Sequence, residues 1–371
     1  MMMRAGVRMA VVAGVVLLAV PCAFAGPITP PPGPVASTHK TLTEVEPRIA
    51  INATNTPGDD DSVFRISQPG SYYLTGRLLG QFGKAGIEIA SSNVTIDLNG
   101  FEVVGAVSSL SGVSATFGFD AISVSNGIVW GWGGSGVAIQ GNGARVERVQ
   151  SKQNASHGVN IGSNGVISFC IARENGATGF QVSTGTLISD CIAATNTSVG
   201  INGNGRCLIT RCTAEGNGSD GITGVFGAQI VDCVSGSNSA NGITVTSGCT
   251  VARCTVSTNF AHGISASVDA LILNNACDGN GTSGTAAGIL ITSSDCRVEG
   301  NTSTDNDWGI RVTSAGNFIA RNTCSGNTTL NWDIVSGNVC LVVSATTAGA
   351  IAGNSGGSPP GSTDPNANFT Y

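Results

Sequence analysis

The chain has 371 residues, of which 53 are glycine, 11% are charged and 5% are aromatic. Average soluble domains have about 25% charged residues, so a coiled coil or a charged disordered tail is excluded. The 17 Lys and Arg residues against 23 Asp and Glu residues give a net charge of −6, which argues against nucleic acid as a partner. Glycine has no three-residue period, so collagen is excluded as well.

Residues 1–25 have the features of a cleavable signal peptide. Two arginines precede an apolar run over residues 9–20, and Ala23-Phe24-Ala25 provides small residues before a cleavage site at Gly26. Pro21 stands before Cys22, where a lipid-modification site normally has Gly or Ala, which argues against a lipoprotein. No later segment is long and apolar enough to cross a membrane. We therefore expect a secreted or cell-surface protein without a membrane span.

Residues 26–61 are expected to form a linker and an N-terminal extension. Residues 26–34 are rich in proline and indicate a stiff, extended linker. The extension ends in Asp59, Asp60 and Asp61, which we interpret as a solvated turn. Hard cations need six or more oxygen ligands, and no nearby residue completes such a shell. The sequence therefore predicts no metal and no cofactor.

Asparagine and glycine then recur in two columns along the sequence. Within each column, successive members are separated by the same number of residues as Asn154 and Asn175. Each glycine of its column is followed by an apolar residue, usually Ile. The asparagine column comprises Asn154, Asn175, Asn196, Asn217, Asn238, Asn259 and Asn280 and, after a short insertion, Asn306 and Asn327. The glycine column comprises Gly158, Gly179, Gly200, Gly221, Gly242, Gly263, Gly288 and Gly309.

Two further columns are apolar or contain cysteine. The apolar runs of each unit are short, β-branched and separated by Gly, Asn and Ser, which predicts strands and not helices. The apolar column comprises Val146, Ile167, Ile188, Ile209, Ile230, Val251, Ile272, Val298 and Ile319. The cysteine column comprises Cys170, Cys191, Cys212, Cys233 and Cys254, and is continued by Asn275, Asn301 and Asn322.

A fixed unit with several short strands and no hairpin signal predicts that each unit is one coil of a parallel β-solenoid. Equivalent residues then stack about 4.8 Å apart, with the Ile and Cys columns inside. Asn tolerates left-handed backbone conformations, so its column is expected to form a ladder of stacked turns. The Ser-rich residues 102–119 interrupt the pattern and are interpreted as a loop over one face or an oligomer contact.

We expect an all-β fold, a single-stranded right-handed parallel β-helix of triangular section. It has about 21 residues per coil and roughly twelve coils over residues 62–345, followed by a C-terminal tail at 346–371.

Three segments resemble the opening coils of a known group of proteins. Residues 69–76 (PGSYYLTG), 93–100 (NVTIDLNG) and 131–134 (GWGG) are similar to secreted bacterial right-handed parallel β-helix proteins of the pectin-lyase-like superfamily. The closing residues 365–371 (PNANFTY) resemble the tail of the same group. The resemblance implies a β-helix for nearly the whole mature chain. It does not single out a function, because this fold hosts lyases, hydrolases, epimerases, adhesins and inert stalks.

The cysteines are expected to be buried thiols. Of the 12 cysteines only Cys22 lies in the expected signal peptide. Stacked cysteines on parallel strands have Cβ atoms too far apart for good disulfide geometry, so we favour thiols over disulfides. Cys207, Cys249 and Cys296 share a second column but skip coils, which keeps them apart. Zinc is disfavoured because a ladder spreads its ligands along a line.

The titratable residues of the solenoid predict no catalytic residue. His157 and His262 are five coils apart and precede the glycine column, so we interpret both as surface histidines. A glycoside hydrolase needs two carboxylates at a defined distance, and a lyase needs acids beside an arginine. Consecutive coils carry instead an outward ladder of alternating charge, at Asp190, Arg211, Asp232 and Arg253.

A polar row two residues after the glycine column is the candidate binding surface. A stacked row of amides and hydroxyls can follow a sugar chain, and it can also merely solvate a sheet. Trp308 occupies a turn position from which it can stack on a sugar ring, whereas Trp132 and Trp332 are expected to cap the solenoid. The row comprises Asn160, Gln181, Asn202, Thr223 and Thr244.

These features together favour an exported β-helix that serves as a non-catalytic polysaccharide-binding or cell-surface module. The alternatives are a carbohydrate-active enzyme of the polysaccharide lyase, hydrolase or epimerase-like kind, and a purely structural spacer. The expected partner is an extracellular or cell-envelope polysaccharide, with self-association left open and nucleic acid disfavoured.

Overall fold

A computed structural model describes residues 47–281, 284–344 and 364–371. Every regular element in these residues is a strand, so this part of the chain has no helix that could span a membrane. The expected signal peptide, its cleavage site at Gly26, Cys22 and the proline-rich linker lie outside the described residues, as does most of the tail after residue 345.

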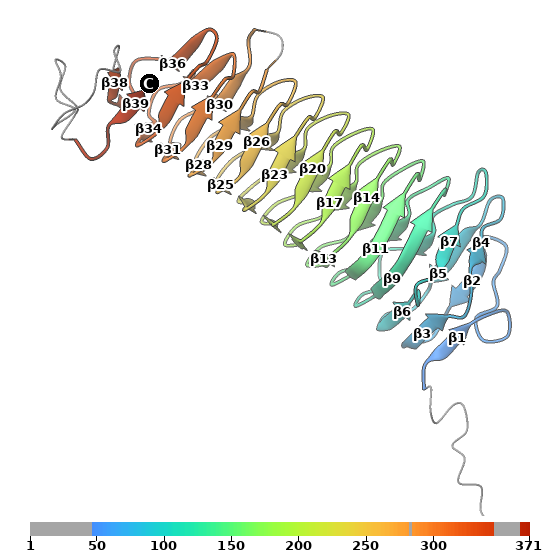
Figure 1. The fold of residues 1–371 in the computed structure, drawn as a ribbon. Helices are drawn as coiled ribbons and strands as arrows, with labels where there is room; N and C mark the ends of the chain where they lie inside the picture. The colour runs from blue at the N-terminus through green and yellow to red at the C-terminus, as the bar shows by residue number, and fades with distance from the viewer. Residues whose placement is uncertain (1–46, 282–283, 345–363) are drawn as a thin grey trace, which may run out of the picture. The chain divides into compact units, whose positions relative to one another are not determined.

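The strands form two parallel sheets, called here sheet A with 26 strands and sheet B with 13 strands. A typical coil contributes one strand to sheet B and two to sheet A, and successive coils stack side by side (Figure 1). Sheet A therefore has two faces, called face I and face II, and a coil has three sides. Thirteen strands in sheet B correspond closely to the roughly twelve coils expected, and the parallel β-helix is confirmed.

Sheet B holds the side of the coil that follows the glycine column. Its strands are β2 (Ser62–Ile66), β5 (Ala85–Ile89), β8 (Val113–Ala115), β10 (Val137–Ile139), β12 (Val159–Ile161), β15 (Phe180–Val182), β18 (Ile201–Gly203), β21 (Ile222–Gly224), β24 (Ile243–Val245), β27 (Ile264–Ala266), β30 (Ala287–Ile291), β33 (Trp308–Val312) and β36 (Leu330–Ile334).

Face I and face II count as one sheet because β9 (Ser123–Trp130) and β11 (Arg145–Lys152) run through both. Face I also has β1 (Ile49–Ile51), β3 (Gly70–Leu74), β6 (Val94–Asp97), β13 (Val166–Ser168), β16 (Leu187–Ser189), β19 (Leu208–Thr210), β22 (Gln229–Val231), β25 (Thr250–Ala252), β28 (Leu271–Leu273), β31 (Arg297–Glu299), β34 (Phe318–Ala320) and β37 (Val339–Cys340). Face II also has β4 (Leu78–Leu79), β7 (Glu102–Val104), β14 (Ile171–Arg173), β17 (Ile192–Ala194), β20 (Thr213–Glu215), β23 (Val234–Gly236), β26 (Thr255–Ser257), β29 (Ala276–Asp278), β32 (Thr302–Thr304), β35 (Thr323–Ser325), β38 (Val342–Ser344) and β39 (Asn368–Thr370).

Two strands and one expected loop extend the solenoid beyond the repeat seen in the sequence. β1 and β39 join sheet A although both lie outside the range 62–345. β7 and β8 lie within residues 102–119 and continue sheets A and B, so the interpretation of this stretch as a loop is correct only for the residues outside these two strands. The residues that break the repeat there form the connection between these two strands.

The apolar column fills the interior as predicted. Each side chain of that column is at most 1% exposed, and neighbouring coils pair in register, as Ile188 does with Ile209. Trp132 is 1% exposed and donates its Nε1–H to the Val103 carbonyl at 3.0 Å. Trp332 packs on the C-terminal end of the core and donates to Thr370 at 2.7 Å, as expected of a cap. The expectation that Trp132 caps the solenoid is wrong, because complete coils both precede and follow this buried side chain.

Each coil turns at corners where one residue has a left-handed backbone and the next side chain points inward. In the coil that begins at β13, these corner residues are Phe169 (φ 54°) and Glu174 (φ 56°), followed by buried Cys170 and Asn175. The ladder asparagines themselves are not left-handed, so the expectation that Asn adopts this conformation is wrong. The residue before each asparagine adopts the left-handed conformation at the turn. The asparagine side chain then points inward, and its amide forms hydrogen bonds inside the solenoid.

The asparagine column forms a buried amide ladder. Asn217 donates its backbone N–H and its Nδ2–H to Oδ1 of Asn238, both at 3.0 Å, and Nδ2 also donates to the Ala193 carbonyl at 3.1 Å. Its own Oδ1 accepts from Asn196 in the same way. The glycine column makes room for this ladder, because a Cβ at Gly221 would lie 2.5 Å from Nδ2 of Asn238.

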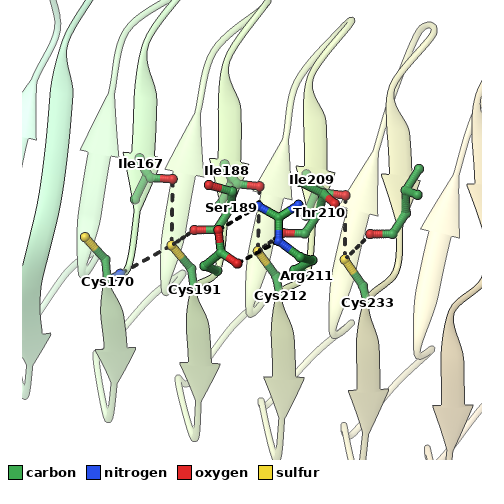
Figure 2. Close-up of polar contacts among 12 residues, drawn as sticks. Ile167, Cys170, Ile188, Ser189, Cys191, Ile209, Thr210, Arg211, Cys212 and Cys233 are labelled. Carbon is green, nitrogen blue, oxygen red and sulfur yellow. Dashed lines mark hydrogen bonds and ion pairs between the residues drawn. The ribbon is translucent and has the colours of Figure 1, made fainter.

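The cysteine column is a ladder of free thiols (Figure 2). Cys212 donates its S–H toward the carbonyl of Thr210 at 3.3 Å, and Cys191 donates toward that of Ser189 at 3.1 Å. All eleven cysteines of the described residues are free, and ten of them are buried, as the stacking geometry predicts. After Cys254 the column changes to Asn275, whose amide continues as a second asparagine ladder.

The C-terminal strand closes this second ladder. β39 pairs with both β35 and β38. Asn322 donates its Nδ2–H to Oδ1 of Asn368 at 2.9 Å, and Asn368 donates to the carbonyls of Ile319 and Leu341. The tail motif therefore supplies a further rung of the ladder at the end of the helix.

Candidate functional site

The outward side of sheet B carries one row of side chains that runs from β2 to β36, called here the axial row. The strands of sheet B are parallel and in register, so each member stacks on the equivalent residue of the next coil. In order along the helix, the row comprises Arg65, Glu88, Ser114, Ala138, Asn160, Gln181, Asn202, Thr223, Thr244, Ser265, Leu290, Arg311 and Asp333. It contains all five residues of the polar row noted in the sequence.

The centre of the axial row is joined by directed hydrogen bonds. Thr223 donates its hydroxyl to Oδ1 of Asn202 at 2.7 Å, and Asn202 donates its Nδ2–H to Oε1 of Gln181 at 2.9 Å. Each of these side chains is half-buried. These hydrogen bonds fix the rotamers of the row. They leave the side-chain N–H groups of Gln181 and the second side-chain N–H of Asn202 facing outward, where a ligand can accept hydrogen bonds from them.

Trp308 lies beside the row and not in it. It belongs to the column immediately before the glycines and pairs with Ala287 and Leu330 of the neighbouring coils. The axial-row residue of its strand is Arg311, whose guanidinium lies 4.7 Å from the Trp308 ring centroid. Arg311 is three coils beyond Thr244, so about 14 Å separates this end from the amide centre.

Arg311 forms an ion pair and packs on Trp308 at the C-terminal end of the row. Its Nε lies 2.9 Å from Oδ2 of Asp333. The Trp308 Nε1–H is buried and has no hydrogen-bond partner among the described residues. The indole is half-buried, with one face covered by Arg311. Its stacking on a sugar ring stays a prediction.

The two histidines are half-buried and accept backbone hydrogen bonds. Nδ1 of His262 accepts from the Ala287 N–H at 2.9 Å, and Nδ1 of His157 accepts from the Thr178 N–H at 3.3 Å. Burial lowers the pKa of both, and the positive charge of Arg311 lowers the pKa of His262 further. They are neutral structural groups at neutral pH and, as expected, share no site.

The N-terminal end of the row holds a cluster of charged groups that the sequence did not reveal. Carboxylate oxygens of Asp59, Asp61 and Glu88 lie within 4.8 Å of one another. Arg65 lies among them, with Nη1 2.7 Å from Oδ2 of Asp59 and Nε 3.6 Å from Oε2 of Glu88. Lys84 donates to the Asp59 carbonyl. We call these five residues the acidic end cluster.

A turn that folds back over β2 brings the acidic end cluster together. Oδ1 of Asn52 accepts from the N–H groups of Thr54 and Asn55, both at 2.9 Å, and Pro57 bridges to Phe64 in an antiparallel sense. This turn places residues 59–61 against the edge of sheet B. The interpretation of the aspartates as a solvated turn is therefore incomplete, because Glu88 joins them from the next coil.

The carboxyl groups of the acidic end cluster differ in their pKa values. Hydrogen bonds from Ser62 and neighbouring groups hold the pKa of Asp59 well below its usual range. The hydrogen bond to Asp59 raises the pKa of Asp61, and burial raises that of Glu88. An ionised carboxylate beside carboxyl groups that keep their protons longer is a pattern used in acid–base catalysis. Arg65 compensates part of the negative charge of the cluster through its ion pairs with Asp59 and Glu88.

The acids and arginines on the outer surface of sheet A form the expected charge ladder. Arg211 makes a bidentate pair with Asp190, with distances of 2.7 and 2.8 Å (Figure 2). Arg253 pairs with Asp232 in the same way, at 2.7 and 3.0 Å. All four lie at the left-handed corner before the cysteine column. Each charge is neutralised by its neighbour, which is consistent with a role in register and not in catalysis.

The repeat length explains why the acidic end cluster was missed. The axial row keeps one constant step through its centre, but the steps from Arg65 to Glu88 and from Glu88 to Ser114 are longer. An alignment that counts in constant steps never places Arg65 and Glu88 in one column. The alternation of buried and outward residues in β2 and β5 is the signal that could have found them.

Comparisons with known proteins agree with this architecture. Residues 112–270 match a family model described as right handed beta helix region. The A-modules of the Azotobacter vinelandii mannuronan C-5 epimerases AlgE4 and AlgE6 are similar in structure, each with a TM-score of 0.57. Their sequences are 17% and 18% identical to this chain, and each comparison covers 73% of this chain and 91% of the module. No curated protein matches the chain in sequence. At this level of identity the likeness shows the fold alone.

Proposed function

We propose that this right-handed parallel β-helix is an exported protein that binds an extracellular or cell-envelope polysaccharide along sheet B without chemically changing it. The axial row carries this proposal. Its central amides and hydroxyls stack in register over consecutive coils, and hydrogen bonds between them hold their polar groups outward. A polymer of sugar units presents hydroxyl groups at regular intervals, and a regular row of donors and acceptors is suited to it.

The similar folds support a carbohydrate ligand. The two epimerase modules are named for mannuronan, a polysaccharide, and their strands follow the same parallel β-helix. No residue role is transferred from these modules to this chain. The proposal for this chain rests on its own axial row, and the similar modules add that this fold occurs in proteins named for a polysaccharide.

A glycan array with the purified protein tests the proposal. We expect binding to at least one polysaccharide, and we expect Asn202→Leu to weaken that binding because it removes the central amide of the row. Gln229→Leu is the matched control, since Gln229 is an outward amide on face I of sheet A. Equal weakening by both variants, or no binding to any glycan, would contradict the proposal.

Export is part of the proposal and has its own test. Expression of the whole gene in a bacterial host, followed by N-terminal sequencing of the exported protein, should give a chain that begins at Gly26. A chain retained in the cytoplasm with residues 1–25 intact would contradict it.

The acidic end cluster favours a second candidate function, a carbohydrate-active enzyme. Three carboxylates converge beside Arg65 at one end of the axial row, and this is the arrangement of acids and an arginine that a lyase or an epimerase-like enzyme would need. In a lyase, a base removes the proton at C5 of a uronate, the C4–O bond breaks and a C4=C5 double bond forms. That product absorbs ultraviolet light.

An assay of the acidic end cluster separates the two candidates. The purified protein is incubated with polyuronates, with and without calcium, and three products are measured: unsaturated ends, new reducing ends and uronates with inverted configuration at C5. Product that disappears in Glu88→Gln, but not in the control Glu215→Gln on face II, would establish the enzyme and refute the non-catalytic proposal. Glycan binding without product would favour the proposal. If the protein neither binds a glycan on the array nor forms product from polyuronates, a structural spacer is the remaining function.

A further inference from the structure

The charges of the axial row lie only at its two ends. Arg65 and Glu88 begin the row, and Arg311 and Asp333 end it. The nine members between them, from Ser114 to Leu290, are all neutral: Ser114, Ala138, Asn160, Gln181, Asn202, Thr223, Thr244, Ser265 and Leu290. We call these nine residues the neutral tract.

Both arginines of the row are already paired with acids. Arg65 lies 2.7 Å from Asp59 and 3.6 Å from Glu88, and Arg311 lies 2.9 Å from Asp333. Neither guanidinium offers an uncompensated positive charge to a ligand. A carboxylate placed on the row would have to displace an existing partner at either end, or stay unpaired along the neutral tract.

The column beside the neutral tract also lacks a cation. Between Ser135 and Ala287 it contains one permanent charge, the carboxylate of Asp220, which accepts a hydrogen bond from the Asn241 N–H at 2.9 Å. The histidines of that column, His157 and His262, have lowered pKa values and are neutral at neutral pH. This flanking column is therefore neutral to weakly negative, in a chain whose net charge is −6.

The tract nevertheless offers both donors and acceptors. The chain of bonds from Thr223 through Asn202 to Gln181 has one direction, so it leaves side-chain N–H groups of Gln181 and Asn202 and the hydroxyl oxygen of Thr223 for a ligand. Sugar hydroxyls donate and accept at once and match such a surface, whereas carboxylates only accept. A carboxylate left without a cation in a half-buried position would also lose part of its hydration without compensation.

The spacing of the tract suits an extended glycan. Neighbouring members are one coil apart, about 4.8 Å, which is close to the length of one pyranose unit in an extended chain. A polysaccharide that runs along the helix axis can therefore place one sugar on each rung. Nine rungs in succession provide a binding face without any charge.

We propose that the ligand of the axial row is a neutral polysaccharide, and that polymers with a carboxylate on every sugar are excluded. This inference rests on the proposed function and adds the chemical class of the ligand. It separates this chain from the two similar epimerase modules, which are named for mannuronan, a polymer of uronate units.

Equilibrium binding of neutral and charged polymers tests the inference. The purified protein is titrated with dextran, mannan and β-linked glucan oligosaccharides, and separately with polymannuronate and polygalacturonate. We expect at least one neutral polymer to bind at least about tenfold more tightly than either polyuronate. The affinity for the neutral polymer should change less than about twofold between about 0.05 and 0.5 M NaCl, because no ion pair contributes.

A matched pair of variants locates the binding face. Thr223→Val removes one hydroxyl from the neutral tract and should weaken neutral-polymer binding about fivefold to tenfold. Thr250→Val makes the same change on face I of sheet A and should leave binding unchanged. Gln181→Lys introduces a cation into the tract and should increase polyuronate binding.

The outcomes distinguish this inference from the proposed function. Tighter binding of a polyuronate, weakened by salt and by Thr223→Val, would overturn the neutral ligand and keep a polysaccharide-binding row. Binding of none of these polymers would overturn both. Neutral-polymer binding that responds equally to Thr223→Val and Thr250→Val would show that the ligand does not lie on the neutral tract.

Discussion

Two corners of the same coil provide an acceptor for a buried backbone N–H with different side chains, asparagine at one corner and cysteine at the other. Each corner has a left-handed residue followed by a buried side chain whose backbone N–H points to the next coil. In the asparagine ladder this N–H donates to an amide oxygen at 2.9–3.2 Å, as from Asn196 to Asn217. In the thiol ladder the equivalent bond, from Cys170 to Cys191, is made to sulfur at 3.5 Å.

The difference shows what the corner requires. A buried N–H needs an acceptor, and an amide oxygen is a much better one than a thiol. The amide also donates to a main-chain carbonyl, as Asn275 does to Val251 at 3.0 Å. The second corner changes from thiol to amide after Cys254, so the same geometry accepts either side chain. The amide ladder should therefore contribute more to stability, coil for coil.

Removing one amide from the middle of the ladder should have the largest effect. Asn217→Ala would leave the N–H of Asn196 without an acceptor and would remove the side-chain donor to the Ala193 carbonyl, both in the interior. We expect a loss of about 3 to 5 kcal/mol in the free energy of unfolding, measured by chemical denaturation. The control Asn202→Ala, on the outward row, should cost less than about 1 kcal/mol. Equal effects would contradict a special role for the ladder.

Filling the space that the glycine column leaves should also be severe. A Cβ at Gly221 would lie 2.1 Å from Oγ of Ser235 and 2.5 Å from Nδ2 of Asn238. Gly221→Ala should therefore cost about 2 to 4 kcal/mol, because the backbone must shift away from the amide ladder. Gly76→Ala is the control, since nothing lies within 4 Å of a Cβ there. If Gly221→Ala is as stable as the control, the amide ladder can shift to make room for the added Cβ at little cost in free energy.

Exchanging the two kinds of rung at their junction sharpens the comparison. Cys254→Asn would extend the amide ladder by one step, with Asn275 as acceptor, and should stabilise the fold by about 1 kcal/mol. The reverse change, Asn275→Cys, should destabilise it by about 1 to 2 kcal/mol. Both are measured by chemical denaturation. If the thiol proves the better rung in both variants, the account of the corner is wrong.

The thiol ladder should be chemically silent while the protein is folded. Ten of the eleven cysteines of the described residues are buried, so an alkylating reagent cannot reach their sulfur atoms, and only the thiolate form reacts. For the buried thiols of Cys277 and Cys324, which lie outside the ladder on face II, burial also raises the pKa. With iodoacetamide and mass spectrometry, we expect labelling of native protein at Cys340 alone, the half-buried thiol, and labelling of all eleven after denaturation. Disulfides between neighbouring rungs, seen after purification under air, would contradict the thiol ladder.

The smallest effect is expected for the charge ladder on the outer surface of the thiol corner. Arg253 lowers the pKa of Asp232, so the pair stabilises the fold above the ordinary Asp pKa of 3.8 and loses this contribution as the pH falls through the lowered value. Both groups are exposed, so Asp232→Asn should change the melting temperature very little at pH 7, and still less once the pH has fallen below the lowered pKa of Asp232. A large change in melting temperature at pH 7 would show that this ion pair contributes strongly to the stability of the register between coils.

Much of the fold could be predicted because its interior repeats. The columns of Ile, Cys, Asn and Gly each reflect one buried position per coil, and their constant spacing reveals them directly. The ladder bonds were also foreseeable, since the side-chain amide of a stacked asparagine can bond to its copy in the next coil. The left-handed residue was assigned to the wrong position because that corner places Gln153, Thr195 and Ser237 there in different coils, and such variation conceals it.

The candidate site was predicted only in part, for the same reason. Asn160 to Thr244 lie in the regular coils, and their row is where the sequence placed it. Arg65 and Glu88 lie in coils of other lengths, and the turn that carries Asp59 folds back by a local Asx turn at Asn52. Trp308 was noted, but its contact with Arg311 depends on side-chain packing that spacing alone does not give.

A fluorescence titration at single positions tests the central claim, that glycan binds along sheet B, most directly. Cys340→Ser removes the one half-buried thiol, and Asn202→Cys or Gln229→Cys then adds a single exposed thiol for an environment-sensitive dye. When a neutral polysaccharide is added, the account predicts a saturable change at position 202, on the axial row, and none at position 229, on face I. A change at 229 with none at 202 would contradict it.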